Sequence, residues 1–523
     1  MTGRLTGNWG HLVTAVLIVC LLLAWEIAGQ MKLVAGGTLP AISAVILRLI
    51  GEFDDYWPHL TATLRTASTG FVIGNLVAVA AAAMFCLWPF SERLFRGINI
   101  TVFTVPPIAI APVLVIALDG DTARITLAAL LVYFPTMTAA LTGMQTADPR
   151  VIDLVHAYGG GNFKALYLVR LRTALPAILS GFQIAAPAAV LGAILAEFGS
   201  GARWGLGSFL LGSLGRAEPD RLWGIGLTAT AISALGYVVA AVAAKWVTGE
   251  NKALSLTVSQ VRAAPAQGRL QSFAMVLAAL LFPFLVWQGL IWASGLSPII
   301  AKTPFGVIDY LFLGKTAESA QARLLVALSQ TVPITLLGMI AGLLFAFLLS
   351  LVSFVSPAIM RAILPFALFT QTMPLVALTP LAVLIFGRGI TVTLVITISV
   401  TFFAAFVVLA QGFALIPKSA FDLVESYGAS TWKKLWLIAV PACGKWIFVA
   451  GRLALPKALL GVMIAEWLAT GKGLGNLLNQ SRGYLDYGMI WSVAVVSILL
   501  SVALYQLAEL AERLLGNGRV TRD

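Results

Sequence analysis

Long apolar stretches dominate the chain, and they have the length of membrane-spanning helices. Such a helix needs about 20 consecutive, mostly apolar residues. Twelve stretches meet this requirement, at residues 11–29, 66–88, 100–118, 124–146, 176–197, 223–246, 273–295, 331–355, 364–386, 391–413, 446–468 and 490–510. The pattern predicts an all-α integral membrane protein with about 12 transmembrane helices. Kinks or breaks are expected where prolines interrupt a span, as at Pro106, Pro107 and Pro112.

The composition supports the same class of protein. Of the 523 residues, 59% are hydrophobic and 11% are charged, against about 25% charged in ordinary soluble domains. Too few polar residues remain to cover the surface of a soluble enzyme of this size. The three cysteines and the three histidines form no cluster in the sequence. We therefore expect no metal site, no cofactor and no disulfide framework.

The basic residues indicate how the chain is oriented in the membrane. The net charge is +12, but the Lys and Arg residues are spread thinly between the apolar stretches, which argues against a nucleic-acid surface. With the N-terminus inside, the cytoplasmic segments carry more of them than the outer loops do. The first apolar run is followed directly by Trp25 and Glu26 rather than by small residues, so we interpret it as a span and not as a cleaved signal peptide. Both termini are expected on the cytoplasmic side of the membrane.

An internal repeat divides the chain into two halves. The segment 153–159 reads Asp-Leu-Val-His-Ala-Tyr-Gly, and the segment 422–428 reads Asp-Leu-Val-Glu-Ser-Tyr-Gly, 269 residues later. At the same or nearly the same shift, prolines, glycines and Ala-Glu pairs also coincide. Each half contains six of the twelve spans, an even number, so the halves have the same orientation. They should be related by a pseudo-two-fold axis along the membrane normal. We predict a first transmembrane domain at 1–247, a cytoplasmic linker at 248–272 and a second transmembrane domain at 273–523.

Each half contains one long cytoplasmic segment between its fourth and fifth spans, at 147–175 and 417–445. In both, a short helical stretch ends at a glycine and a second amphipathic stretch follows. The glycines should permit a positive φ at a tight helix end. Apolar anchors then follow at a spacing of three residues. This pattern favours a helix–Gly–helix knob that docks into a groove of a cytosolic partner. The candidate docking residues are Asp153, Tyr158, Gly159, Phe163 and Leu166 in the first half, and Asp422, Tyr427, Gly428, Trp432 and Leu435 in the second.

The alternative is an ordinary amphipathic loop on the membrane surface. Two matched copies at corresponding positions of the repeat favour the docking interpretation.

The paired loops resemble those of binding-protein-dependent ABC importer permeases, whose motif combines a Glu-Ala-Ala triplet, a glycine and a later Leu-Pro. The branch that handles sulfonates, taurine and nitrate is most similar. Supporting marks include Leu39-Pro40, the Pro374–Pro380 segment, and Ala465-Glu466 followed by Gly473-Leu-Gly475. The resemblance covers nearly the whole chain, once per half, although such permeases are usually single six-span subunits that pair. It implies the fold of a type I ABC importer transmembrane domain, with two permease domains fused.

Partners and departures follow from the same resemblance. It implies a place in the inner membrane of a bacterial cell, an outer solute-binding protein that delivers a small solute, and two ATP-binding subunits that dock on the two knobs. Both halves have Asp-Leu-Val in place of the Glu-Ala-Ala triplet. The first half has Gly159-Gly-Gly-Asn where the second has the more family-like Gly428-Ala-Ser.

A few charged and polar residues in the spans are candidates for the translocation path. Arg452 lies one or two turns inside the eleventh span, and Gln183 occupies the matching place in the first half. Arg452, with Lys457 following it, could attract an anion, or it could extend its charge to the inner membrane surface. Glu197 and Glu466 end their spans at the outer edge. They could be interfacial carboxylates, or they could line an outer gate.

The sequence argues against catalysis by this chain. Gly314-Lys315-Thr316 resembles the end of a phosphate-binding loop, but Asp309 stands where that motif needs its first glycine. We therefore expect a transport subunit that hydrolyses no ATP itself. The alternative is a twelve-span secondary transporter of a small solute, which would need a coupling site in its middle spans.

Overall fold

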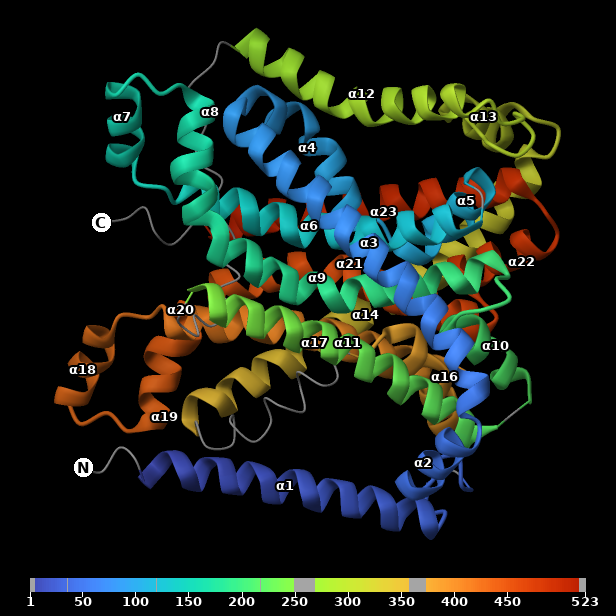
Figure 1. The fold of residues 1–523 in the computed structure, drawn as a ribbon, viewed down its shortest axis with the longest axis horizontal. Helices are drawn as coiled ribbons and strands as arrows, with labels where there is room; N and C mark the ends of the chain where they lie inside the picture. The colour runs from blue at the N-terminus through green and yellow to red at the C-terminus, as the bar shows by residue number, and fades with distance from the viewer. Residues whose placement is uncertain are drawn as a thin grey trace.

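The computed structural model describes residues 5–34, 36–118, 120–216, 218–248, 269–356 and 373–516. Within these ranges the regular structure is entirely helical, as the apolar pattern predicts. Figure 1 shows most of the long helices running lengthwise through one bundle, with α12 and α1 along two opposite sides of it.

The described elements of the two halves follow one another in a similar order. The first contains α1 (Leu5–Gln30), α2 (Ile42–Gly51), α3 (Phe53–Leu87), α4 (Pro89–Thr104), α5 (Pro107–Ala117), α6 (Gly120–Gln145), α7 (Pro149–Ala157), α8 (Asn162–Ala165), the π-helical turn η1 (Leu166–Arg170), α9 (Leu171–Ser200), α10 (Leu206–Arg216) and α11 (Pro219–Thr248). The second contains α12 (Arg269–Ser294), α13 (Pro304–Ile308), η2 (Asp309–Leu313), α14 (Ala317–Val355), α16 (Leu375–Phe386), α17 (Ile390–Ala414), α18 (Lys418–Ser426), α19 (Thr431–Lys434), η3 (Leu435–Ala439), α20 (Val440–Ala442), α21 (Gly444–Ala465), η4 (Glu466–Thr470), α22 (Gly473–Gly483) and α23 (Tyr487–Gly516).

Fewer spans are evident in the described residues than the apolar pattern predicts. Eight helices there are long and apolar enough to cross a membrane, or nine if one bent pair counts as a span. The expected spans at 11–29, 273–295 and 364–386 are represented by shorter apolar segments, Val19–Gln30, Leu281–Ser294 and Leu375–Phe386. The beginning of the third of these, and most of the linker at 248–272, lie outside the described residues.

The expected span at 100–118 is not one continuous helix. It is broken between α4 and α5, which meet at an angle of 106°. Pro106 and Pro107 stand at the break, and Pro106 has an extended backbone (φ −68°, ψ 115°). Because neither proline offers a backbone N–H, the helical hydrogen-bond ladder stops there. The prolines therefore produce a break and not a mild kink.

Matched glycines bring the helices of each half close together. A Cβ added to Gly70 of α3 would lie 2.5 Å from Ala128 Cβ of α6. A Cβ added to Gly74 would lie 2.7 Å from Ala129 O of the same helix. Gly338 and Gly342 of α14 approach Thr397 and Thr401 of α17 in the same way. These are the small-residue contacts by which membrane helices pack.

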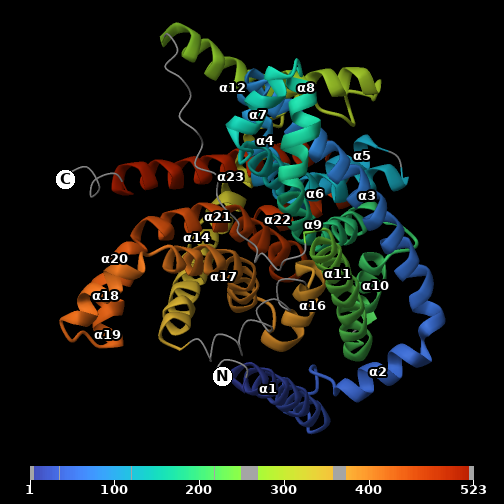
Figure 2. The same cartoon turned by 60° about the vertical axis from the view of Figure 1, so that its left-hand side comes forward.

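Contacts between the two halves are reciprocal. In one direction α11 and α10 of the first half contact α16 of the second. In the other direction, α23 and α22 of the second half contact α5 of the first. A further matched pair of contacts joins α16 of the second half to α9 of the first, and α5 of the first half to α21 of the second. Figure 2, turned from Figure 1, shows α11 beside α16 near the middle of the molecule. The repeat seen in the sequence is thus also a repeat of contacts.

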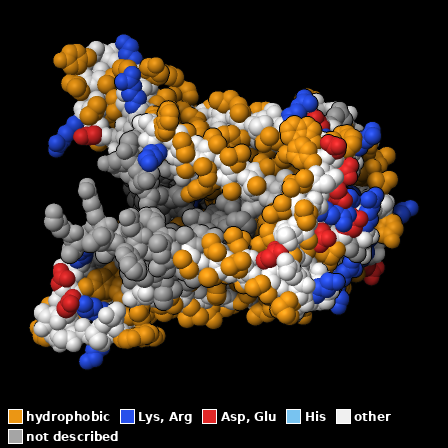
Figure 3. All heavy atoms as spheres, turned by 60° about the horizontal axis from the view of Figure 1, so that its bottom comes forward, with side chains coloured by type: hydrophobic (Ala, Val, Ile, Leu, Met, Phe, Trp, Pro, Cys, Tyr) orange, Lys and Arg blue, Asp and Glu red, His pale blue; other side chains and the backbone are white. Residues whose placement is uncertain are grey.

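Charge is distributed as a membrane protein requires. Figure 3 shows a mostly hydrophobic middle zone with Lys, Arg, Asp and Glu gathered towards the two ends. At its left-hand end two separate lobes project, and both carry hydrophobic and basic side chains.

Candidate functional site

The first lobe, hereafter knob one, is formed by α7, α8 and η1. Asp148 caps α7 by accepting a hydrogen bond from Arg150 N (2.9 Å). The helix ends at Ala157, and Gly159, two residues later, has a φ of +76°. Gly160 N donates to Val155 O (2.8 Å), and Gly159 N donates to His156 O (2.9 Å). This pair of bonds is the Schellman motif, and it turns the chain back into α8.

The second lobe, knob two, repeats this geometry with α18, α19 and η3. Gly428 has the same φ, +76°. Ala429 N donates to Val424 O (3.0 Å), and Gly428 N donates to Glu425 O (2.8 Å). An added Cβ would meet no atom within 4 Å of either glycine, so the positive φ alone accounts for the need for glycine here. The predicted helix–Gly–helix geometry is confirmed in both halves.

Both knobs present the same kind of surface. Tyr158 and Tyr427 are 86% and 85% exposed. Large apolar side chains surround each tyrosine in matched pairs: Leu154 and Leu423, Phe163 and Trp432, Tyr167 and Trp436, and Leu168 and Leu437. Asp153 and Asp422 are exposed beside them. Exposed apolar side chains in such numbers indicate an interaction surface.

The expectation that Leu166 and Leu435 face a partner is wrong. Their exposed fractions are only 8% and 1%. Leu166 packs in a core that includes Phe85 and Met144, and Leu435 packs with Phe413. Each leucine therefore fixes its knob to its own half of the bundle. The exposed row runs instead at a spacing of four, through Phe163 and Tyr167 and through Trp432 and Trp436.

The two knobs differ in the side-chain hydrogen bonds and ion pairs that hold their short helices. In knob two, Ser430 caps α19 and Lys434 Nζ lies 2.6 Å from Glu425 Oε2. In knob one, Gly161 stands at the cap position without a side-chain bond. The second knob therefore has two side-chain bonds that the first lacks at these places.

At the far end of the bundle from the knobs, each half contains a buried carboxylate that holds a glycine loop. Thr63 Oγ1 donates to Glu197 Oε1 (2.7 Å), and Gly207 N donates to Glu197 Oε2 (2.7 Å). In the second half, Thr331 Oγ1 donates to Glu466 Oε1 (2.7 Å), and Gly475 N donates to Oε2 (2.9 Å). Leu206 N and Leu474 N in turn donate to the two threonine hydroxyls. We call each set of bonds a loop brace.

The interpretation of Glu197 and Glu466 as interfacial carboxylates is wrong, because the side chains are only 1% and 2% exposed. Each brace fixes the start of α10 or α22 against a long helix of the same half. A Cβ on Gly205 or Gly473 would collide with the carboxylate. The sequence hint was present, because each Glu residue is followed within eight residues by a Gly-Leu-Gly triplet.

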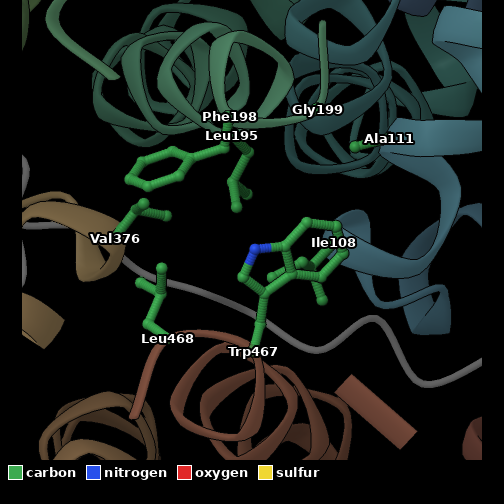
Figure 4. Close-up of a pocket in the computed structure, with 8 residues that line it drawn as sticks. All are labelled: Ile108, Ala111, Leu195, Phe198, Gly199, Val376, Trp467 and Leu468. Carbon is green, nitrogen blue, oxygen red and sulfur yellow. The ribbon is translucent and has the colours of Figure 1, made fainter. Parts of the chain in front are cut away.

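Beside the braces, a small apolar cavity lies where the halves meet (Figure 4). Its lining residues come from α5, α9, α16 and η4: Ile108, Ala111, Leu195, Phe198, Gly199, Val376, Trp467 and Leu468. Arg482 of α22 closes this region by donating from Nη1 to Phe198 O (2.9 Å) and Gly199 O (3.0 Å) of the other half. Its guanidinium also lies 5.5 Å from the Trp467 ring centroid. The repeat places Leu214 at the matching position, so this bond between halves occurs on one side.

Arg452 is not the unpaired cation that the sequence suggests. Its Nη1 lies 3.2 Å from Glu512 Oε2 of α23, and its guanidinium lies 5.6 Å from the Tyr505 ring centroid. Gln183 is half-buried in α9, and the structure brings neither residue to the cavity lining. Lys457, five residues further along α21, is considered below.

The described residues hold no group of three or more His, Cys, Asp or Glu side chains placed to bind a metal. The matched surfaces of the two knobs are thus the feature of the structure that most clearly indicates a function.

Comparison with known proteins identifies one family twice in the chain. The binding-protein-dependent transport system inner membrane component family matches residues 70–249 and 334–517. A probable ABC transporter permease protein of Haemophilus influenzae is 28% identical over 225 residues, which are 43% of this chain and 91% of that protein. A riboflavin transport system permease protein of Chloroflexus aurantiacus is 31% identical over 155 residues, which are 30% of this chain and 58% of that protein. A taurine transport system permease protein of Escherichia coli is 27% identical over 175 residues, or 32% of this chain and 64% of that protein.

Proposed function

Because the chain belongs to the binding-protein-dependent transport system inner membrane component family, we propose that it forms a complete translocation unit from two permease domains in one polypeptide. It is the inner-membrane permease component of an ABC transport system, and it is a transport subunit rather than an enzyme. Such systems include a binding protein and an ATPase as partners. The resemblance to ABC permeases noted from the paired loops is confirmed. The family also excludes the secondary transporter that the sequence left open.

The proposed unit has twelve spans, six in each half. The domains are those predicted from the repeat, 1–247 and 273–523, with 248–272 as a cytoplasmic linker. The two family matches fall one in each half, and the Haemophilus relative has about half the length of this chain. The reciprocal contacts of α11 with α16 and of α23 with α5 support a pseudo-two-fold arrangement.

Two ATP-binding subunits dock on the cytoplasmic side, one on knob one and one on knob two. This proposal rests on one observation. Five apolar or aromatic side chains of knob one are exposed around a helix that ends in a Schellman motif, and each has an exposed counterpart at the matching position of knob two. An apolar helix pair of this kind inserts into a groove of its partner. In Figure 1 the described ends of α1 and α23 lie at the same end of the molecule as the knobs. We therefore propose that both termini are cytoplasmic.

The binding protein delivers its solute at the opposite end, and the solute passes between the halves. The apolar cavity and the Arg482 bond lie there, so we assign them to a closed outer gate. Glu197 and Glu466 act as positioning residues for the loops around that gate. Arg452, through its pair with Glu512, joins α21 to α23 near the inner end of the path, and Gln183 occupies the matching place in α9. The relatives are named for solutes as different as riboflavin and taurine, so they indicate a small solute without identifying it.

The docking proposal is tested by co-purification of the chain with its cognate ATP-binding subunit. The double variant Tyr427→Ala/Trp432→Ala removes two of the most exposed aromatic side chains of knob two, and Tyr158→Ala/Phe163→Ala does the same for knob one. Since large interface aromatics often contribute more than about 2 kcal/mol each, each double variant should lose one ATPase subunit. The four-residue combination should lose both.

Tyr484→Ala is the matched control, because Tyr484 is 83% exposed but lies at the opposite end of the bundle. It should retain both subunits. Full ATPase binding by the four-residue variant would contradict the proposal.

A further inference from the structure

Lys457 lies in the middle of a membrane span. It is the twelfth residue of the span Trp446–Thr470, so about 17 Å of helix separate it from the nearer end at 1.5 Å per residue. That distance is too long for its side chain to reach either membrane surface. A lysine at this depth is costly and is retained where it has a function.

The surroundings of Lys457 are protein rather than lipid. Every residue from Ala454 to Trp467 is buried except Lys457, which is half-buried. Because consecutive residues of a helix point in all directions around its axis, this part of α21 is enclosed on every side. The accessible part of Lys457 must therefore face an opening inside the protein.

The repeat supports an internal opening. The residue matched to Lys457 at a shift of 269 is Ala188 of α9, and it is also half-buried although Ala189 and Val190 beside it are buried. The helices α9 and α21 hold corresponding places in the two halves and contact α16 and α5, respectively, of the opposite half. Both positions therefore lie in helices that border the region between the halves.

Nothing in the described residues neutralises the charge of Lys457. It takes part in no ion pair or hydrogen bond there. Of the helices packed against α21, α17, α16 and α5 contain no charged residue. The charge of α22, Arg482, bonds to the other half, and that of η4, Glu466, is held in its loop brace. The charges of α14 are at its outer end, Glu318 and Arg323, and the acidic residues of α23 are in its last turns, Glu509 and Glu512. Arg452 on α21 itself is already paired with Glu512.

We propose that Lys457 is an anion contact in the translocation path and that the solute carried by this chain bears a negative charge. This inference rests on the proposed function, since it takes the opening between the halves as the path. A mobile anion supplies the counter-charge that the fixed structure lacks, and its passage leaves the lysine ready for the next one. Lys457 replaces Arg452 as the cation that a solute meets.

The test measures the charge preference of the opening with two thiol reagents. Leu453→Cys is placed in a chain that carries Cys20→Ser, Cys86→Ala and Cys443→Ala. Leu453 is half-buried and lies one turn before Lys457 on the same face of α21. The full chain, assembled with its ATPase subunits in lipid nanodiscs, is treated with anionic 2-sulfonatoethyl methanethiosulfonate and with cationic 2-(trimethylammonium)ethyl methanethiosulfonate.

The measured quantity is the rate of Leu453→Cys modification by the anionic reagent divided by the rate with the cationic reagent. We expect this ratio to be higher than the same ratio for free cysteine. Adding Lys457→Met should lower that ratio on the order of tenfold, since a full charge within one helical turn is removed. Adding Lys457→Arg, the matched control that retains the charge, should leave it unchanged.

An unchanged ratio in the Lys457→Met chain would overturn the proposal. Failure of both reagents to label Leu453→Cys would also overturn it, because no water-filled opening would then reach Lys457. The labelling needs no ATP hydrolysis, so it can fail while the ATPase-docking proposal succeeds, and the reverse is equally possible.

Discussion

At the scale of single residues, Gly159 and Gly428 decide the shape of the knobs. Their identical φ of +76° lies in the left-handed region, where a β-branched side chain adds about 1–2 kcal/mol of strain. Gly428→Val should therefore distort knob two and uncouple ATP hydrolysis from solute delivery, with normal expression. Gly428→Asn is the matched control, because asparagine tolerates this conformation and no neighbour lies within 4 Å.

The measurement is the ATPase activity of the assembled complex with and without solute-loaded binding protein. Gly159→Val should act in the same way through knob one. Wild-type stimulation in Gly428→Val would show that the bend at this glycine does not matter for coupling.

The loop braces give a second prediction at the residue scale. Thr331→Val keeps the shape of the side chain but removes the hydroxyl that donates to Glu466 and accepts from Leu474 N. Buried groups left without a partner cost about 1–3 kcal/mol each. The variant, and Thr63→Val in the first half, should therefore lower the midpoint of thermal unfolding in detergent.

Thr335→Val serves as the control, because the Thr335 hydroxyl is equally buried but bonds only to the carbonyl of Thr331 in its own helix. It should have the smaller effect. Equal midpoints for the Thr331 and Thr335 variants would mean that the brace contributes nothing to stability.

Which residue charges are paired could not be predicted from sequence spacing. Arg452 meets Glu512 across 60 positions of the chain, and no local pattern indicates that contact. The sequence therefore selected Arg452 as the free cation, whereas it is Lys457 that has no counter-charge among the described residues. The burial of Glu197 and Glu466 was missed for the same reason, since their threonine donors lie more than 130 residues away.

At the scale of elements, the knobs were the part of the site that the sequence predicted best. The glycine, the two short helices and most of the exposed aromatics follow from local pattern and from the repeat. The orientation of Leu166 and Leu435 did not. Both begin a π-helical turn, and the exposed row follows a spacing of four instead of three, so these leucines turn into the bundle.

A group of charged side chains joins the ends of three helices of the first half and gives a pH prediction. Glu52, between α2 and α3, lies 2.8 Å from Arg48 Nε and 2.8 Å from Arg221 Nε of α11. The hydrogen bond from Arg221 is the main cause that lowers the pKa of Glu52 below its ordinary value. The folded state therefore binds a proton on Glu52 less readily than the unfolded state does. The ionised Glu52 carboxylate gives the folded state a stabilising effect that is fully present above the ordinary carboxyl pKa. It is lost as the pH falls through the lowered value.

The unfolding midpoint of the wild-type protein should therefore fall on acidification, and Glu52→Gln should show a weaker dependence on pH in that range. Glu318→Gln, at an exposed carboxylate of α14, should follow the wild type. Parallel curves for the wild type and Glu52→Gln would rule out this contribution.

At the scale of the whole molecule, the repeat in the sequence becomes a repeat of contacts between halves. The chain pairs α11 with α16 and α23 with α5, as two separate subunits related by a two-fold axis would. The sequence predicted this symmetry because both copies retain matching glycines and prolines. It could not predict the one-sided bond of Arg482 to Phe198 and Gly199, because Leu214 stands at the matching place.

The central claim is that one chain supplies both halves of the translocation unit and both docking sites. Native mass spectrometry of the assembly, purified in detergent with its ATPase subunits, tests this claim most directly. We predict a mass equal to one permease chain of 55.4 kDa plus two ATP-binding subunits. A mass with a second permease chain for the same two ATPase subunits would leave one knob of each chain unused, and it would contradict the account.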